Sequence, residues 1–206
     1  MKLSRKFYSR DAREVSIDLL GKILVHDING IKLKGRIVET EAYIADLDKA
    51  SHAYGGRRTA RNEALYGKPG ISYVFSIYGL YYCFNVITKK EESAEGVLVR
   101  ALEPVDGLDE IARLRFKTSY DKLTRLQVKN LTSGPSKLCM ALNITKENNM
   151  EDLCGDKLYI EYDKNEDPNN KFEIVHTKRI GIDYAEEAKD FLWRYYIKDN
   201  PYVSKK

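Results

Sequence analysis

Two acidic residues separated by one position point to a possible catalytic site. Glu39 and Glu41 lie in the run Arg36-Ile-Val-Glu-Thr-Glu-Ala-Tyr43, which reads as a β-strand. Alternate residues of a strand point to the same face, so both carboxylates are expected on one face with Tyr43. Burial of two acids is costly unless they have partners or do chemistry. The pair fits a two-carboxylate glycoside hydrolase, a single general base, or a solvated strand face without function.

Tyrosine is the unusual residue of this composition. The chain holds 15 Tyr beside one Trp and six Phe, and several of the tyrosines cluster between positions 43 and 82. The surplus is either ordinary strand composition or a surface that stacks on flat ligands such as nucleobases. Two aromatic-rich runs, 72–78 and 81–88, flank Gly79-Leu80, which predicts a tight hairpin with a type II′ turn. A bulky Tyr78 at its tip indicates a partner such as stacked DNA bases, unless the tip folds back onto the core.

The pattern along the chain predicts one mixed α+β domain over residues 1–206. Asn29-Gly30 predicts a hairpin that leads into the strand carrying the two acids, and the long loop 45–71 is of a kind that is usually functional. Helical pieces are expected within 106–142, interrupted at Gly134-Pro135, and a turn is expected at 167–170. Hairpin connections favour a curved, mostly antiparallel sheet with surrounding helices and a protruding β-hairpin.

Composition excludes several classes of protein. The chain is 43% hydrophobic, enough for a core without disulfides. No apolar run approaches about 18 residues, the length that crosses a membrane, and the basic N-terminus lacks the apolar stretch of a secretory signal. Three cysteines and three histidines, widely spaced, predict no metal site and no disulfide framework. Residues 112–137 hold seven basic residues and one acid, which indicates either a polyanion-binding surface or a solvated helix face.

Eight blocks of the sequence, in family order, resemble the alkyladenine (3-methyladenine) DNA glycosylase family of the mammalian type. The blocks are residues 36–43, 50–53, 56–62, 68–70, 73–85, 99–104, 133–138 and 179–182. The resemblance extends from about residue 10 to 203 and implies a base-excision repair enzyme. Such an enzyme flips an alkylated or deaminated purine out of duplex DNA and hydrolyses its N-glycosidic bond, leaving an abasic site. The sequence does not select among 3-methyladenine, 7-methylguanine, hypoxanthine and ethenoadenine, nor does it identify an acid that would protonate a neutral base.

The resemblance also implies roles for residues around the bond to be cut. Glu41 matches the general base that activates water, whereas Glu39 matches no catalytic position and is expected to be structural. Arg100 and the main-chain carbonyl of Ile180 match the groups that hold the water. The flipped base is expected to lie among Tyr43, His52 and Phe75, above an Asn85 amide that disfavours guanine. Phe75 departs from the Tyr of vertebrate members but keeps the stacking face.

The same resemblance implies how duplex DNA is held. Tyr78 matches the residue that intercalates into the gap left by the flipped nucleotide, with Leu80 and Tyr81 as supporting contacts. The expected contacts to the DNA backbone are Arg57, Thr59, Tyr81 and Lys137. No lysine matches a catalytic nucleophile, so a monofunctional glycosylase without lyase activity is expected.

The resemblance implies no cofactor, no metal and no membrane. The expected partner is duplex DNA with damaged purines, bound by a monomer inside the cell, in the cytoplasm and nucleoid or in a eukaryotic nucleus. Three other readings are a catalytically silent nucleic-acid-binding module on the same fold, a hydrolase of free nucleosides and a metal-dependent nuclease. The presence of both Glu41 and Arg100 favours an enzyme over a silent module. The hairpin tip favours duplex DNA over free nucleosides, because a free nucleoside leaves no gap to fill.

Overall fold

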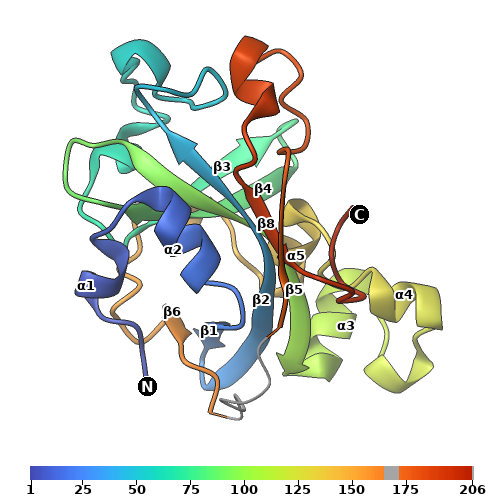
Figure 1. The fold of residues 1–206 in the computed structure, drawn as a ribbon. Helices are drawn as coiled ribbons and strands as arrows, with labels where there is room; N and C mark the ends of the chain where they lie inside the picture. The colour runs from blue at the N-terminus through green and yellow to red at the C-terminus, as the bar shows by residue number, and fades with distance from the viewer. Residues whose placement is uncertain (165–171, 206) are drawn as a thin grey trace.

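A computed structural model describes residues 1–164 and 172–205. Its centre is an eight-stranded sheet with the strand order β3-β4-β5-β2-β1-β6, in which β8 pairs with both β2 and β7 (Figure 1). All pairings between these strands are antiparallel. The predicted fold class, α+β with a mostly antiparallel sheet, is therefore confirmed. The turn expected at 167–170 lies outside the described residues.

The elements follow one another closely along the chain. The strands are β1 (Ile23–Ile28), β2 (Ile31–Ile44), β3 (Ser72–Ile77), β4 (Tyr81–Thr88), β5 (Glu95–Asp106), β6 (Leu158–Glu161), β7 (Ile174–Thr177) and β8 (Arg194–Ile197). The α-helices are α1 (Arg5–Tyr8), α2 (Ala12–Asp18), α3 (Leu108–Phe116), α4 (Arg125–Lys129) and α5 (Pro135–Ala141). Short 3-10 helices are η1 (Tyr54–Gly56), η2 (Glu63–Tyr66), η3 (Tyr120–Lys122), η4 (Lys146–Asn148) and η5 (Glu186–Asp190). No helix in the described ranges is long and apolar enough to cross a membrane.

Strand β2 organises the molecule because it has partners along both edges. Asn29 and Gly30 have φ values of 53° and 89°, the left-handed conformations that a two-residue type I′ hairpin requires. That turn sets the pairing of β1 with the first half of β2, and β8 pairs with the second half from Glu39 to Glu41. The other edge of β2 pairs with β5 over nearly its whole length. The acidic run thus lies in the best-supported part of the sheet.

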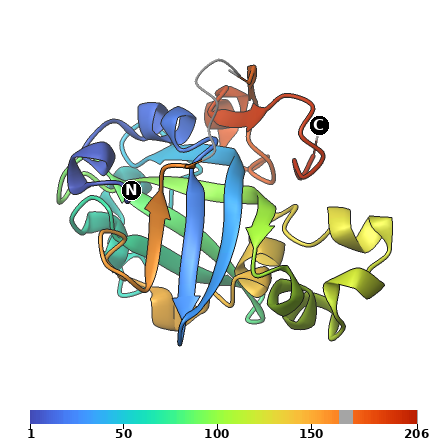
Figure 2. The same ribbon diagram turned by 90° about the horizontal axis from the view of Figure 1, so that it is seen from below.

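Helices cover the sheet on different sides. The N-terminal helices α1 and α2 lie on one side of β2 and β5, whereas α3, α4 and α5 lie on the other, with α3 and α4 projecting from the body (Figures 1 and 2). Asp11 caps α2 through its side chain, which accepts from the N–H of Arg13. The Thr40 hydroxyl donates to the Ser16 carbonyl and joins β2 to α2 at 2.9 Å. The Gly134-Pro135 interruption is the start of α5, with Pro at the first helical position.

The aromatic hairpin β3–β4 differs from the expected two-residue loop. Ile77 pairs with Tyr81, so the loop has three residues, Tyr78 to Leu80. Tyr78 and Gly79 both have positive φ, 51° and 71°, and the Leu80 N–H donates to the Ile77 carbonyl at 3.3 Å. Positive φ at both central residues is the type I′ pattern rather than type II′, and the prediction of Gly79-Leu80 as the turn is wrong. The extra residue moves Tyr78 from the end of β3 to the apex.

Candidate active site

One cavity brings together residues from most of the sequence blocks. It has a volume of about 220 Å³. Six residues expected from the sequence line it: Tyr43, His52, Phe75, Asn85, Arg100 and Ile180. They come from β2, the loop after it, β3, β4, β5 and the segment before η5. The cavity thus has the size of a site for one small molecule.

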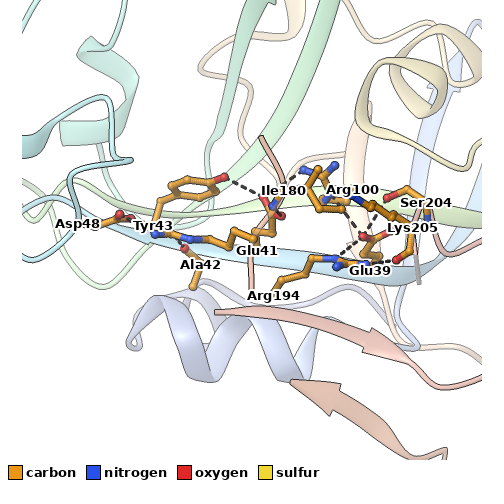
Figure 3. Close-up of polar contacts among 11 residues, drawn as sticks. Glu39, Glu41, Ala42, Tyr43, Asp48, Arg100, Ile180, Arg194, Ser204 and Lys205 are labelled. Atoms are coloured by element: carbon orange, nitrogen blue, oxygen red, sulfur yellow. Dashed lines mark hydrogen bonds and ion pairs between the residues drawn. The ribbon is translucent and has the colours of Figure 1, made fainter. Parts of the chain in front are cut away.

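Glu41 is not itself among the residues that line this cavity, but it contacts three that are, Tyr43, Arg100 and Ile180. These contacts hold its carboxylate from three directions (Figure 3). Its side chain is fully buried. The Tyr43 hydroxyl donates to Oε2 at 2.8 Å, Nη1 of Arg100 donates to the same oxygen at 3.2 Å, and the main-chain N–H of Ile180 donates to Oε1 at 2.9 Å. The three donors fix the orientation of the carboxylate. The sequence analysis expected the carbonyl of Ile180 to contact a water molecule. The structure shows in addition that the N–H of Ile180 contacts Glu41.

Arg100 reaches Glu41 because of an irregularity in β5. In the pairing of β2 with β5, Glu39 lies opposite Ala101 and Thr40 lies opposite Val99, so Arg100 is passed over. Such a bulge re-aims a side chain. Here the guanidinium lies 3.2 Å from Glu41 and 3.4 Å from Glu39. Burial opposes the positive charge, but the two carboxylates outweigh it and raise the pKa of Arg100.

Glu39 is committed to other partners. Its Oε1 accepts from Nε of Arg194 at 2.7 Å, and its Oε2 accepts from the N–H of Ser204 at 2.7 Å. The Ser204 hydroxyl also donates to Oε1 at 3.0 Å, and the Arg194 guanidinium continues to the Lys205 carbonyl. Figure 3 shows these contacts on the side of Arg100 away from Tyr43. The two acids therefore differ: Glu39 joins β2 to β8 and the C-terminal segment, whereas Glu41 contacts the cavity-lining residues Tyr43 and Ile180.

Aromatic rings form the cavity around Glu41. The phenol of Tyr43 has a pKa well above its usual range, because of burial and then the adjacent Glu41 carboxylate, so its hydroxyl keeps the proton it donates. His52 and Phe75 meet edge to face with ring centroids 4.7 Å apart. The Nδ1 atom of His52 lies 2.9 Å from the Tyr73 hydroxyl. Burial, followed by the charges of Arg61 and Arg57, lowers the pKa of His52, so a neutral ring is expected at neutral pH.

Asn85 forms part of the cavity wall in a fixed orientation. Its Nδ2 donates to the Tyr73 carbonyl at 3.0 Å, and the side chain is 7% exposed. Its other amide atom, Oδ1, is left as the group available to the cavity. A buried amide tied to a strand backbone cannot turn away from a ligand without losing this hydrogen bond.

Residues expected to contact DNA lie on the surface outside the cavity. Tyr78 is 91% exposed and Leu80 is 78% exposed at the hairpin apex, followed by Tyr81 at 42%. Arg57 and Thr59 border a smaller hollow beside His52. Lys137 lies on α5, where its ammonium donates to Asn130 Oδ1 at 2.6 Å. Large exposed apolar side chains at a hairpin apex are typical of a surface that binds a partner.

The structure also places residues at the site that sequence reasoning did not single out. Tyr73 contacts His52 with its hydroxyl and Asn85 with its carbonyl. Asp48 and Arg179 form a buried ion pair behind Tyr43. Arg179 belongs to the 179–182 block, so the sequence resemblance could have pointed to it. Nothing in the sequence pattern singled out Asp48. The described ranges contain no group of three or more His, Cys, Asp or Glu side chains placed to hold a metal ion.

Comparisons with known proteins identify the family of the chain. The family model for methylpurine-DNA glycosylase matches residues 6–201. A protein of Clostridium botulinum strain Langeland, named "Putative 3-methyladenine DNA glycosylase", is 62% identical over 207 residues and covers 100% of both chains. A protein of Clostridium tetani with the same name is 61% identical over the same full length. The chain belongs to the methylpurine-DNA glycosylase family, hydrolases that act on N-glycosyl bonds in base excision repair.

Proposed function

We propose that this protein flips an alkylated or deaminated purine nucleotide out of duplex DNA and cleaves the bond between base and sugar with a water molecule. One observation carries the proposal: three residues that line the cavity, Tyr43, Arg100 and Ile180, donate hydrogen bonds to the buried carboxylate of Glu41. Base flipping is needed because the bond is hidden inside a stacked duplex. The flipped base would lie among Tyr43, His52 and Phe75.

Glu41 acts as the general base in this mechanism. Water attacks the anomeric carbon of the sugar while its bond to the purine nitrogen breaks, and the bonding electrons leave with the base. The proton of the attacking water passes to Glu41. A base alkylated at N3 or N7 is cationic and departs as a neutral molecule, so it needs no acid. The products are the free base and an abasic site.

Duplex binding is assigned to the exposed surface around the cavity. Tyr78 enters the base stack and fills the gap, with Leu80 and Tyr81 beside it. Arg57, Thr59 and Lys137 contact phosphates and hold the duplex without reading its sequence. A monomer that uses no cofactor is sufficient for these steps.

The decisive experiment compares Glu41→Gln with the wild type. Release of 3-methyladenine, 7-methylguanine, hypoxanthine and ethenoadenine from duplex oligonucleotides is measured for both proteins under single-turnover conditions. We expect release by Glu41→Gln to fall to background while binding of the duplex persists. Undiminished release by this variant would refute the role of Glu41. Trapping with borohydride tests the monofunctional mechanism, because a covalent adduct would require an amine nucleophile.

A further inference from the structure

A fully buried ion pair lies behind the proposed catalytic glutamate. The guanidinium of Arg179 binds both carboxylate oxygens of Asp48, at 2.5 Å and 2.7 Å, and neither side chain is exposed. Burial opposes the charge of Arg179, but hydrogen bonding to Asp48 prevails and raises its pKa. A buried ion pair seldom adds net stability compared with apolar residues of similar size. Its presence next to the site therefore calls for another explanation.

The contacts of Arg179 lead directly to the neighbours of Glu41. Nη1 donates to the Ala42 carbonyl at 2.9 Å, which lies between Glu41 and Tyr43 in β2. The guanidinium stacks on the Tyr43 ring, 4.6 Å from its centroid. Nη2 donates to the Ala188 carbonyl at 3.1 Å. This hydrogen bond anchors the segment that carries Ile180.

Two of the three donors to Glu41 thus depend on one side chain. Tyr43 is held through its ring, and the N–H of Ile180 belongs to the residue that follows Arg179 in the chain. The third donor, Arg100, comes from β5 and is independent of this arrangement. Asp48 fixes the plane of the guanidinium, because the two parallel bonds allow only one orientation.

We propose that Asp48 and Arg179 form a positioning pair that holds the Tyr43 hydroxyl and the Ile180 N–H on the carboxylate of Glu41. This inference rests on the proposed role of Glu41 as the general base. Neither residue of the pair contacts Glu41 with a hydrogen bond among the described contacts, so both act through Tyr43 and Ile180. If the pair is disturbed, two of the donors that orient the Glu41 carboxylate are no longer held in place, and the excision rate should fall.

The Arg179→Lys variant tests whether the shape of the Arg179 side chain matters beyond its positive charge. Lysine keeps the positive charge near the site but lacks the planar fork and the stacking face. Asp48→Asn is a milder second variant that keeps the shape of the partner. Arg5→Lys is the matched control, because Arg5 also binds both oxygens of an aspartate, Asp152, at 2.7 Å and 2.6 Å, and neither residue lines the cavity.

The readout is the single-turnover excision rate as a function of pH. The charged and titratable groups around Glu41 are Glu39, Tyr43, Asp48, Cys83, Arg100, Arg179 and Arg194. Each variant changes one of these groups and retains all the others. We expect Arg179→Lys and Asp48→Asn to lower the rate at neutral pH by on the order of 10- to 100-fold, as for a misplaced catalytic group. The shape of their pH–rate profile should differ from that of the wild type, whereas affinity for undamaged duplex should change less than about threefold.

Each outcome decides between the alternatives. A wild-type rate and pH profile in folded Arg179→Lys overturns the inference, and so does a loss that only follows the folded fraction with the pH profile unmoved. If Arg179→Lys and Asp48→Asn both fail to fold while Arg5→Lys folds, the pair serves the fold and the inference is also overturned. If Glu41→Gln excises bases normally, the proposed function fails instead, whatever the two variants show.

Discussion

The main-chain N–H of Ile180 lies 2.9 Å from Oε1 of Glu41, across 139 positions of sequence. A main-chain donor cannot be removed by a side-chain substitution, so this contact is built into the path of the chain between β7 and η5. With the Tyr43 hydroxyl on the other oxygen, it fixes the plane of the carboxylate toward the cavity. The predictions below test this arrangement and the surface around it.

Tyr43→Phe removes the hydroxyl that donates to Glu41 and keeps the aromatic ring. Loss of a hydrogen bond to a charged group costs about 1.5–3 kcal/mol, which corresponds to roughly 10- to 100-fold in rate if the bond persists in the transition state. Single-turnover rates between pH 5 and 9 measure this loss. An unchanged profile would show that Tyr43 contributes only its ring.

Tyr78→Ala shortens the side chain at the apex of the aromatic hairpin. We expect slower excision and weaker binding of a lesion-containing duplex, because the gap left by the flipped nucleotide is no longer filled. Binding of undamaged duplex at low salt should change much less, since it depends on phosphate contacts. Ile31→Ala is the control: Ile31 is 54% exposed and lies in the other hairpin, β1–β2. Equal losses on damaged and undamaged DNA would count against intercalation.

Asn85→Ala should relax discrimination against guanine. The Asn85 amide is tied to the Tyr73 carbonyl, so in the wild type it cannot make room for the 2-amino group of the base. Its truncation opens the cavity there, and release of 7-methylguanine should rise relative to release of hypoxanthine. Competition between the two lesions in one reaction measures the ratio directly. A ratio that stays at the wild-type value would remove Asn85 from the specificity argument.

Arg57→Ala and Lys137→Ala should weaken binding of any duplex about equally. Each removes one proposed phosphate contact, so the slope of log K against log salt should become shallower by about one per substitution. Fluorescence anisotropy over a range of salt concentrations gives the slope. Lys198→Ala is a suitable control because Lys198 follows β8 and pairs with Glu173. A slope identical to the wild type would place these two residues away from DNA.

His52 should titrate below its usual pKa of about 6.5, because burial and the charges of Arg61 and Arg57 disfavour its cation. Burial also raises the pKa of Tyr73 to about 12, so its hydroxyl stays protonated and can donate to Nδ1. As pH falls through the lowered pKa, the imidazolium places a new positive charge beside the base. Excision of cationic 7-methylguanine should then decline more steeply than excision of neutral hypoxanthine.

NMR titration of the His52 ring checks the pKa, and paired pH profiles for the two lesions check the consequence. A midpoint at or above 6.5 would contradict the effect of burial. Parallel profiles for the two lesions would show that the charge of His52 does not reach the base.

Much of the local structure was determined by the sequence alone. Asn29-Gly30 specifies its turn because few other residues adopt positive φ readily. Asp11 marks the start of α2, and the alternation in β2 places Glu39 and Glu41 on one face. These features depend on neighbours a few positions apart, so short-range pattern is sufficient. The sequence did not determine where Tyr78 lies in the hairpin loop, because both Tyr78-Gly79 and Gly79-Leu80 are compatible with a tight turn.

The strand pattern left the two acids equivalent and the family resemblance assigned them different roles, but only the tertiary structure supplies their different partners. Glu39 meets Arg194 and Ser204, whereas Glu41 meets Tyr43 and the N–H of Ile180. The bulge in β5 that turns Arg100 toward both acids has no sequence signal of its own. The pairing of Asp48 with Arg179 joins positions 131 residues apart. Such partners are selected by how the sheet and the C-terminal segment pack, because the cost of burying a charge is offset only where a complementary group is brought to it.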